Sequence, residues 1–274
     1  MYLYYLLGWK MDTCRIQNSL GNPLKKERTY LLALDGDVNF EAKDFELVLD
    51  RLSRNPDVAA CCNQIHPAGS GPIVWFQRFE YAIGHWFQKS AEHALGCVLC
   101  SPGCFSLIRV EFLMRDNVMA TYRSLAKSPF EKLMYDQGED RWLCTLILLA
   151  GGRIEFEAGS HCQTFAPEDV ETFYKQRRRW GPSTAVNIIQ LIHHSSEAII
   201  RNAYISRFYI FYHILMLSLS TVSIATVLMV LWEALELGLD GQLNSGTCAA
   251  IIFLPVIVYI IVCFKCSSGS DSSN

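Results

Sequence analysis

The sequence has little net charge and no excess of basic residues. It contains 24 Lys and Arg residues against 27 Asp and Glu, which gives a net charge of −3 at pH 7. A nucleic-acid-binding domain needs a clear surplus of positive charge to neutralise phosphates. We therefore expect no nucleic-acid partner. Because 51% of the 274 residues are hydrophobic and 19% are charged, the composition is typical of a folded chain.

Signals for secretion and for a disulfide framework are also missing. Residues 1–9 are apolar but lack the basic start and the small-residue cleavage site of a signal peptide. The eleven cysteines are scattered and odd in number, which favours reduced thiols in a cytosolic domain. Cys97, Cys100 and Cys104 leave a zinc site open. No second ligand pair lies at zinc-finger spacing, however, so we favour buried thiols.

Two long stretches near the C-terminus contain no charged residue. Residues 208–232 form a run of 25, enough at about 1.5 Å per residue to cross a bilayer core. Residues 247–264 form a second run of 18, for which a buried core helix stays open because of its length and of Pro255. Arginines precede the first run, the connection is acidic, and Lys265 follows the second. The positive-inside rule therefore predicts a cytosolic N-terminal domain and C-terminal tail.

Apolar strands alternate with amphipathic helices before these runs. The predicted strands are residues 29–34, 58–65 and 153–157, with further strand-like residues flanking a turn in 97–109. The predicted helices are residues 44–54, 75–95, 138–150 and 167–180. This alternation predicts an α/β domain with a mainly parallel sheet. A further amphipathic helix, residues 183–204, comes directly before the membrane spans and is expected to lie along the bilayer surface.

Two carboxylates follow the first predicted strand. Asp35 and Asp37 lie at its C-terminal end, where open α/β sheets bind their ligands. With Gly36 allowing a tight turn, the pair would suit a hard divalent cation that also holds phosphate oxygens. An ordinary acidic turn is the alternative.

Glu139 and Asp140 stand at a predicted helix start. Asp is favoured as a helix N-cap, and this interpretation prevails when the pair is considered alone. The functional interpretation is a general base that accepts a proton from an acceptor hydroxyl.

A basic cluster ending in tryptophan precedes the membrane runs. In one interpretation, the only role of this cluster is to set the membrane topology. Alternatively, Arg179 neutralises a departing diphosphate, Gln176 hydrogen-bonds it, and Trp180 offers a flat face to a sugar ring.

Taken together, the three groups resemble processive family-two glycosyltransferases, and animal-type chitin synthases in particular. The order Asp-x-Asp, Glu-Asp, Gln-x-x-Arg-Trp followed by membrane spans carries the likeness. It extends over most of residues 30–190 and is strongest in 34–38 (LDGDV), 79–89 (FEYAIGHWFQK), 97–105 (CVLCSPGCF), 138–145 (GEDRWLCT) and 176–180 (QRRRW). Hyaluronan and cellulose synthases share the outline but not these strings.

The resemblance implies a fold and an activity. Residues 1–182 would form a partial GT-A-type nucleotide-sugar domain, 183–205 an interfacial helix, and 206–274 two transmembrane helices with a polar tail. The enzyme would transfer N-acetylglucosamine from UDP-N-acetylglucosamine to a growing β-1,4 chitin chain with inversion. As a multi-pass plasma-membrane protein it would export the polymer through the lipid bilayer, and a homo-oligomer is left open.

Roles for individual residues also follow from the resemblance. Asp35 and Asp37 would bind Mg²⁺ or Mn²⁺ on the UDP, with Asp37 preferred, and Asp140 would be the general base. Other residues would hold the diphosphate, the donor sugar and the acceptor end: Glu139, Gln176, Arg179, Trp180, and Cys100, Ser101 and Gly103 of the turn.

The sequence departs from this family at both ends. Only 34 residues precede Asp35, whereas the family's uridine-binding strands come well before the Asp-x-Asp, and the later spans are absent. Two hypotheses result: part of a working synthase, or a truncated, catalytically inactive membrane homologue that associates with full-length synthases. Under both, we expect the 274-residue chain alone to polymerise nothing.

Overall fold

A computed structural model of the chain describes residues 29–115, 118–238, 244, 246–254 and 257–258. The chain divides into two compact units, Met1–His213 and Ile214–Asn274. Each unit is considered separately below. The first unit contains the sheet and every candidate site residue.

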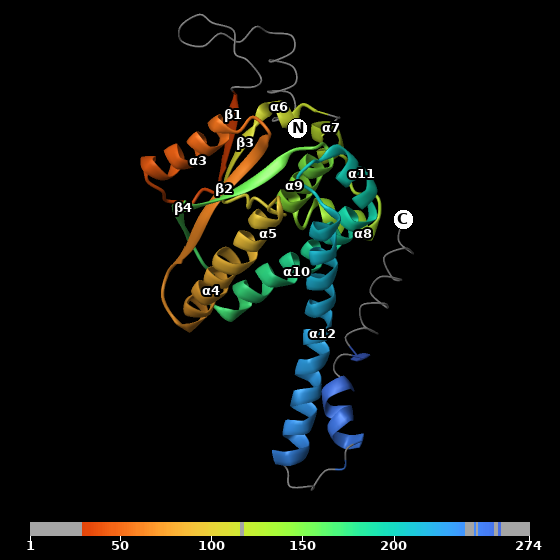
Figure 1. Cartoon of the computed structure of the whole chain (residues 1–274). Helices are drawn as coiled ribbons and strands as arrows, with labels where there is room; N and C mark the ends of the chain where they lie inside the picture. Colours follow the sequence, from red (N-terminus) through yellow and green to blue (C-terminus); the bar gives the residue numbers. More distant parts are fainter. Residues whose placement is uncertain (1–28, 116–117, 239–243, 245, 255–256, 259–274) are drawn as a thin grey trace, which may run out of the picture. The chain divides into compact units, whose positions relative to one another are not determined.

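The first unit is built on a four-stranded sheet in the order β1-β3-β2-β4 (Figure 1). Its strands are β1 (Tyr30–Leu34), β2 (Val58–Ala68), β3 (Phe105–Arg109) and β4 (Arg153–Phe165). β3 is antiparallel to both β1 and β2, and only β2 and β4 pair in parallel. The three predicted strands are confirmed, and β1, β2 and β4 run in one direction, as expected of a mainly parallel sheet. β3 runs against them, although a helical connection over residues 72–95 precedes it.

Helices cover both faces of this sheet. α3 (Ala42–Arg54) packs on one face, whereas a nearly continuous helical stretch and α9 (Glu139–Leu149) lie against the other (Figure 1). That stretch consists of α4 (Pro72–Ile83), the π-helical segment η3 (Gly84–Lys89) and α5 (Ser90–Leu95). Three short helices, α6 (Val110–Leu113), α7 (Val118–Tyr122) and α8 (Pro129–Tyr135), connect β3 to α9.

The central strand β2 explains the position of the core. Its residues 58–65 are all buried, as a strand covered on both faces must be. Cys61 and Ile65 pack with Val48 and Leu52 of α3. Cys62 points the other way and accepts a hydrogen bond from Lys89 at the end of η3. Side chains of β2 therefore pack on both faces of the sheet.

Arg109 ties the sheet to α3. Its side chain is only 4% exposed, and its guanidinium donates to the carbonyl oxygens of Leu52, of Asn55 at 3.0 Å and of Val58 at 3.1 Å. These carbonyls belong to the C-terminal turn of α3 and the start of β2. A cation is favourable at a helix C-terminus because it satisfies carbonyls that have no intrahelical partner.

One long helix replaces two that the sequence predicted. The expected helices at 167–180 and 183–204 are wrong in their bounds: α10 (Val170–His193) runs through Pro182, and α11 (Ser195–Arg201) follows a break at His194. Proline inside a helix costs about 3 kcal/mol. Burial of apolar side chains such as Val186 and Leu191 beside α9 offsets it. Placement along a bilayer surface remains a prediction.

α12 (Arg207–Gly238) is long and apolar enough to cross a membrane. It has 32 residues, a mean hydropathy of 2.4 in its most apolar window, and none of that window buried. It is the only such helix among the described residues, and it confirms the first predicted apolar span as a helix. Much of the second predicted span, 247–264, lies outside the described residues. Among the residues that are described in this region, 246–254 are helical.

Candidate active site

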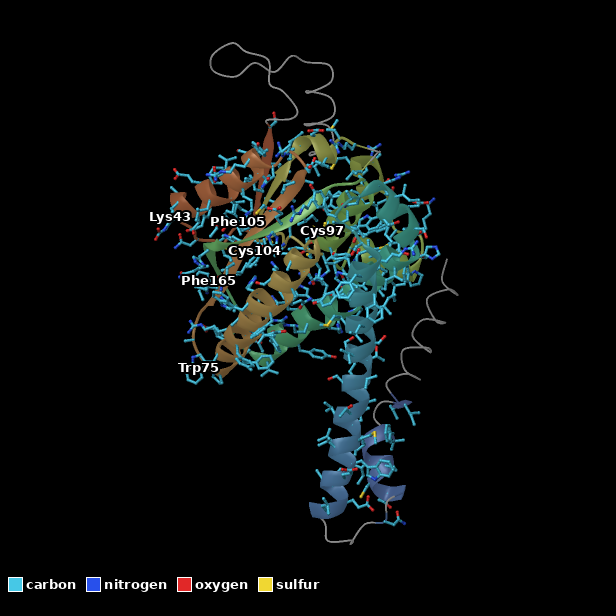
Figure 2. All side chains as sticks on the ribbon, viewed as in Figure 1. Lys43, Trp75, Cys97, Cys104, Phe105 and Phe165 are labelled. Atoms are coloured by element: carbon cyan, nitrogen blue, oxygen red, sulfur yellow. The ribbon has the colours of Figure 1, made fainter. Side chains whose placement is uncertain are left out.

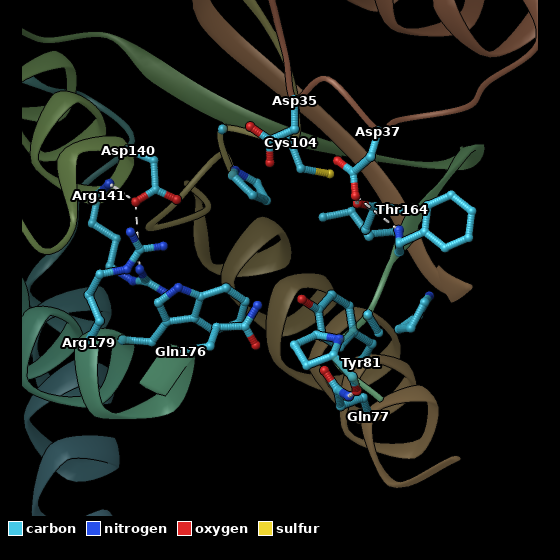
Figure 3. A pocket seen from close by; sticks show the side chains of 18 of the residues that line it. Asp35, Asp37, Gln77, Tyr81, Cys104, Asp140, Arg141, Thr164, Gln176 and Arg179 are labelled. Carbon is cyan, nitrogen blue, oxygen red and sulfur yellow. Dashed lines mark hydrogen bonds and ion pairs between the residues drawn. The ribbon is translucent and has the colours of Figure 1, made fainter. Parts of the chain in front are cut away.

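A cavity of about 440 Å³ gathers the predicted site residues (Figure 3). We call it the acidic cavity. It is formed where the end of β1, the turn before β3, the start of α9, the end of β4 and the middle of α10 meet. Eight of the residues predicted from sequence line it: Asp35, Asp37, Gly103, Glu139, Asp140, Gln176, Arg179 and Trp180.

The two aspartates after β1 point in different directions. Asp37 reaches the end of β4, where its Oδ2 accepts hydrogen bonds from Thr164 Oγ1 at 3.1 Å and from Phe165 N at 3.2 Å. Asp35 points toward Asp140 (Figure 3). Partial burial, followed by the negative charges of Asp37 and Asp140, raises the pKa of Asp35, and Arg179 opposes this. The carboxylates therefore leave a local excess of negative charge that a cation would relieve.

This arrangement fits a divalent cation that arrives with phosphate. The described residues contain no cluster of three or more His, Cys, Asp or Glu side chains suited to a metal. Asp35 and Asp37 offer two hard carboxylates, and Mg²⁺ is usually bound by one or two carboxylates together with substrate phosphates and water. The donor set thus suits Mg²⁺ or Mn²⁺ in complex with a diphosphate better than a permanent metal centre.

Asp140 is held in the first turn of α9 and is not its cap. The N-cap residue is Gly138, so the capping interpretation is wrong. Oδ1 of Asp140 accepts a hydrogen bond from Arg141 N at 2.8 Å and lies 3.6 Å from Arg141 Nη1. Its Oδ2 receives only a weak 3.8 Å contact from the Cys100 thiol. With 23% of its side chain exposed, the carboxylate keeps an oxygen available to a ligand.

A second cavity of about 530 Å³ adjoins the first, and we call it the inner cavity. It runs along α4, η3, α5 and the opposing side of α10. The two cavities share a wall made of Ile65, Tyr81, Pro102, Asp140, Arg141 and Trp180. The Asp140 carboxylate therefore borders both spaces.

Helical spacing divides α10 between the two cavities. Gln176, Arg179 and Trp180 line the acidic cavity, whereas Arg177, Trp180 and Thr184 line the inner one. Positions three and four apart share one face of a helix. Trp180 stands at the edge common to both faces.

Two guanidinium groups lie near the Trp180 indole. The Cζ atoms of Arg177 and Arg141 lie 4.6 Å and 5.9 Å from its ring. Arg177 Nη2 is in turn 2.7 Å from Glu80 Oε2 on α4. Cation–π contacts of this kind orient an aromatic ring while leaving part of its face free.

The turn before β3 is only partly at the site. Gly103 lines the acidic cavity and Cys100 the inner one. Ser101, in contrast, is 3% exposed, hydrogen-bonds Ser106, and lines neither cavity. Cys97 and Cys104 lie well apart (Figure 2), which argues against a zinc ion shared by the three thiols.

Sequence reasoning missed several residues of the site. Tyr81 lines both cavities, and burial raises its pKa to about 12. Tyr81 and Glu80 lie in a string that carried the family resemblance, so a role for them was within reach. Thr164 had no signal, because its link to Asp37 spans 127 residues of chain.

Comparisons with known proteins show the family of the chain. A sequence model of the chitin synthase family matches residues 15–268. The chain is 42% identical over 271 residues to a chitin synthase of Meloidogyne artiellia. It is 44% and 42% identical to chitin synthases chs-2 and chs-1 of Caenorhabditis elegans, over 96% and 98% of its length. These alignments cover only 14% to 20% of the relatives' own length.

Proposed function

This chain belongs to the chitin synthase family, and from that premise we propose that it carries the catalytic residues of a membrane-bound glycosyltransferase. The enzyme transfers N-acetylglucosamine from UDP-N-acetylglucosamine to the end of a β-1,4 chitin chain. The observation that carries the proposal is the position of Asp140 in the wall between two cavities. One cavity suits an anionic nucleotide sugar and the other suits a sugar chain.

The donor occupies the acidic cavity. Asp35 and Asp37 would hold the Mg²⁺ or Mn²⁺ that accompanies the diphosphate, and the bound ion would supply Lewis-acid stabilisation of the departing charge. Arg179 adds a fixed positive charge, and Gln176 donates a hydrogen bond to the diphosphate. Glu139 and Gly103 border the sugar.

The acceptor approaches through the inner cavity. Its terminal sugar stacks on Trp180, and its hydroxyl donates its proton to Asp140 as the new glycosidic bond forms. Because donor and acceptor reach Asp140 from different cavities, the acceptor oxygen attacks from the side opposite the leaving diphosphate. This arrangement supports a single displacement with inversion at the anomeric carbon.

The membrane assignment rests on α12. We propose that α12 anchors the enzyme in the plasma membrane with the catalytic domain in the cytosol, as the arginines before the apolar run predict.

Six large apolar side chains on the outer face of α4 and η3 are also 44% to 72% exposed: Trp75, Phe76, Phe79, Ile83, Trp86 and Phe87. The polymer leaves the inner cavity toward the membrane, where further spans complete an export path. Assembly into a homo-oligomer is compatible with this arrangement.

The test uses a chimera of this chain with chitin synthase chs-2 of Caenorhabditis elegans. Replacing the matching segment of Caenorhabditis elegans chs-2 by this chain gives a full-length protein to express in cells without endogenous chitin synthase. Membranes are assayed for incorporation of labelled N-acetylglucosamine into chitinase-sensitive polymer. Asp140→Asn should reduce incorporation by a factor of about 100 to 10,000.

A matched control removes a carboxylate that lies away from both cavities. Glu171 is on α10 and forms an exposed ion pair with Lys175 at 2.6 Å. Glu171→Gln should retain normal activity. Full activity of the Asp140→Asn chimera would refute the assignment of the general base.

The hypothesis of an inactive homologue predicts a different outcome. Under it, the chimera would make no polymer although it reaches the membrane, and the 274-residue chain would co-purify with full-length synthase. The gathering of Asp35, Asp37, Asp140, Arg179 and Trp180 around one cavity favours the catalytic hypothesis. Under both, the 274-residue chain alone should give no polymer, and robust synthesis from it would contradict that expectation.

A further inference from the structure

Arg177 occupies a position that the diphosphate role of its neighbours does not explain. It lies within the same basic cluster as Arg179 but on the adjacent face of α10, toward the inner cavity. Its Cζ is 4.6 Å from the Trp180 ring and 5.0 Å from the Phe173 ring. The guanidinium is therefore stacked among aromatic rings.

Glu80 is the acidic partner of this guanidinium. The Oε2–Nη2 distance is 2.7 Å, and the side chains of Glu80 and Arg177 are 41% and 24% exposed. Among the residues that the structure describes, no other carboxylate forms an ion pair with Arg177. The pair joins two elements of the cavity wall, α4 and α10, that are far apart in the sequence.

We propose that Glu80 is a positioning residue for the acceptor sugar: its carboxylate fixes Arg177 against the Trp180 indole and so sets the orientation of the stacking surface. The inference rests on the proposed function, because it assigns the acceptor to the inner cavity. Glu80 acts through Arg177 and needs no contact with substrate.

The physical reason is the geometry of the cluster. The Glu80 carboxylate attracts the guanidinium by charge at 2.7 Å, whereas an aromatic ring attracts it with little directional preference. Without Glu80, Arg177 keeps its charge but loses the anion that determines its position. The indole then loses one of the two guanidinium groups that lie near it.

The first test separates acceptor binding from donor binding in the chs-2 chimera. Glu80→Gln should raise the KM for a soluble chito-oligosaccharide acceptor roughly tenfold, as expected for loss of one coupled pair. The KM for UDP-N-acetylglucosamine should stay unchanged, because Asp35 and Arg179 lie in the other cavity. Arg177→Gln should raise the acceptor KM at least as much, adding Glu80→Gln to it should raise the KM no further, and Glu171→Gln should have no effect.

A second measurement needs no activity. The 274-residue chain is produced with 5-fluorotryptophan in place of tryptophan and studied in detergent. The Trp180 signal is assigned by its loss in Trp180→Phe. In the ¹⁹F spectrum, Glu80→Gln should shift or broaden this one signal, and it should cause little further change when Arg177→Gln is already present. Glu171→Gln should leave it unchanged.

The outcomes separate the two proposals. An inactive wild-type chimera would count against the proposed function, while the Trp180 signal would still test the positioning role. A Trp180 signal that Glu80→Gln leaves unchanged would overturn that role. Effects of Glu80→Gln and Arg177→Gln on the acceptor KM that add in the double variant would also overturn it, because Glu80 would then act independently of Arg177.

Discussion

Gly138 sets the distance between Asp140, the proposed general base, and α10, which carries the residues proposed to hold the diphosphate. An added Cβ at this position would lie 1.6 Å from Ser183 Oγ and 2.9 Å from Ser183 Cβ on α10. The φ of Gly138 is −149°, a value open to alanine. Any effect of Gly138→Ala must therefore come from this close approach of the start of α9 to α10.

The size of the effect follows from these distances. If Ser183 rotates its hydroxyl away, the two Cβ atoms must still separate by about 0.5 Å to reach ordinary contact, and by more if it does not rotate. Asp140 lies two residues after Gly138, and Arg179 lies four residues before Ser183 on α10. A misplacement of about 1 Å at a catalytic group can lower the rate about 100-fold. We expect Gly138→Ala to lower kcat of the chimera by about 10- to 100-fold.

The assay compares kcat with folding. Overpacking should destabilise the domain by about 1–3 kcal/mol, which thermal unfolding of the detergent-solubilised protein would detect. The double variant Gly138→Ala with Ser183→Gly should regain most of kcat, because it removes both close contacts. Gly36→Ala is the control, since nothing lies within 4 Å of an added Cβ there. Unaltered kcat in a folded Gly138→Ala protein would refute the reasoning.

Three further predictions concern the acidic cavity, the acceptor surface and the core. The raised pKa of Asp35 implies that Mn²⁺ affinity in the presence of UDP is full above that pKa and falls about tenfold per pH unit below it. Electron paramagnetic resonance should show this pH dependence, and Asp35→Asn should abolish it. A flat profile of Mn²⁺ affinity against pH in the wild-type protein would contradict the prediction. Trp180→Ala should raise the acceptor KM about tenfold, whereas Trp180→Phe should keep much of the affinity because it keeps a stacking face; equal KM values for the two variants would contradict a stacking role. Arg109→Met should lower the free energy of unfolding by about 3 kcal/mol, because three carbonyls of α3 and β2 lose their donor; a change below about 1 kcal/mol in chemical denaturation would show that these bonds are dispensable.

The elements with strong local signals were predictable from sequence. β1 and β2 contain apolar runs bounded by turns, β4 begins with alternating charged and apolar residues, and α3 has a clear amphipathic period. The position of β3 was not predictable, because its antiparallel insertion between β1 and β2 depends on pairing with residues distant in the sequence. The continuity of α10 also escaped prediction, since burial against α9 outweighs the local effect of Pro182.

The site was predictable to the extent that its motifs are short and contiguous. Asp35, Asp140 and Arg179 meet at one cavity although more than a hundred residues separate the first from the last. The expected tight turn at Gly36, in contrast, needs no glycine, because its φ is not positive and an added Cβ meets nothing. Ser101 was misplaced because a residue within a functional turn can still point into the core.

Helix periodicity on α10 separates the residues of the two cavities. The series that includes Gln176 and the series that includes Arg177 occupy faces offset by one position and meet at Trp180. On α4, Gln77 lines the acidic cavity and Glu80 the inner one, and Tyr81 borders both. Each of the two helices therefore has an aromatic residue where the cavities meet.

The helical position of each residue on α10 therefore predicts which substrate's kinetics it affects. Positions 176 and 179 should affect donor kinetics, whereas 177 and 184 should affect acceptor kinetics, because each pair shares one helical face. The same basic cluster would then serve two substrates, with the role of each side chain decided by its helical position rather than by its charge.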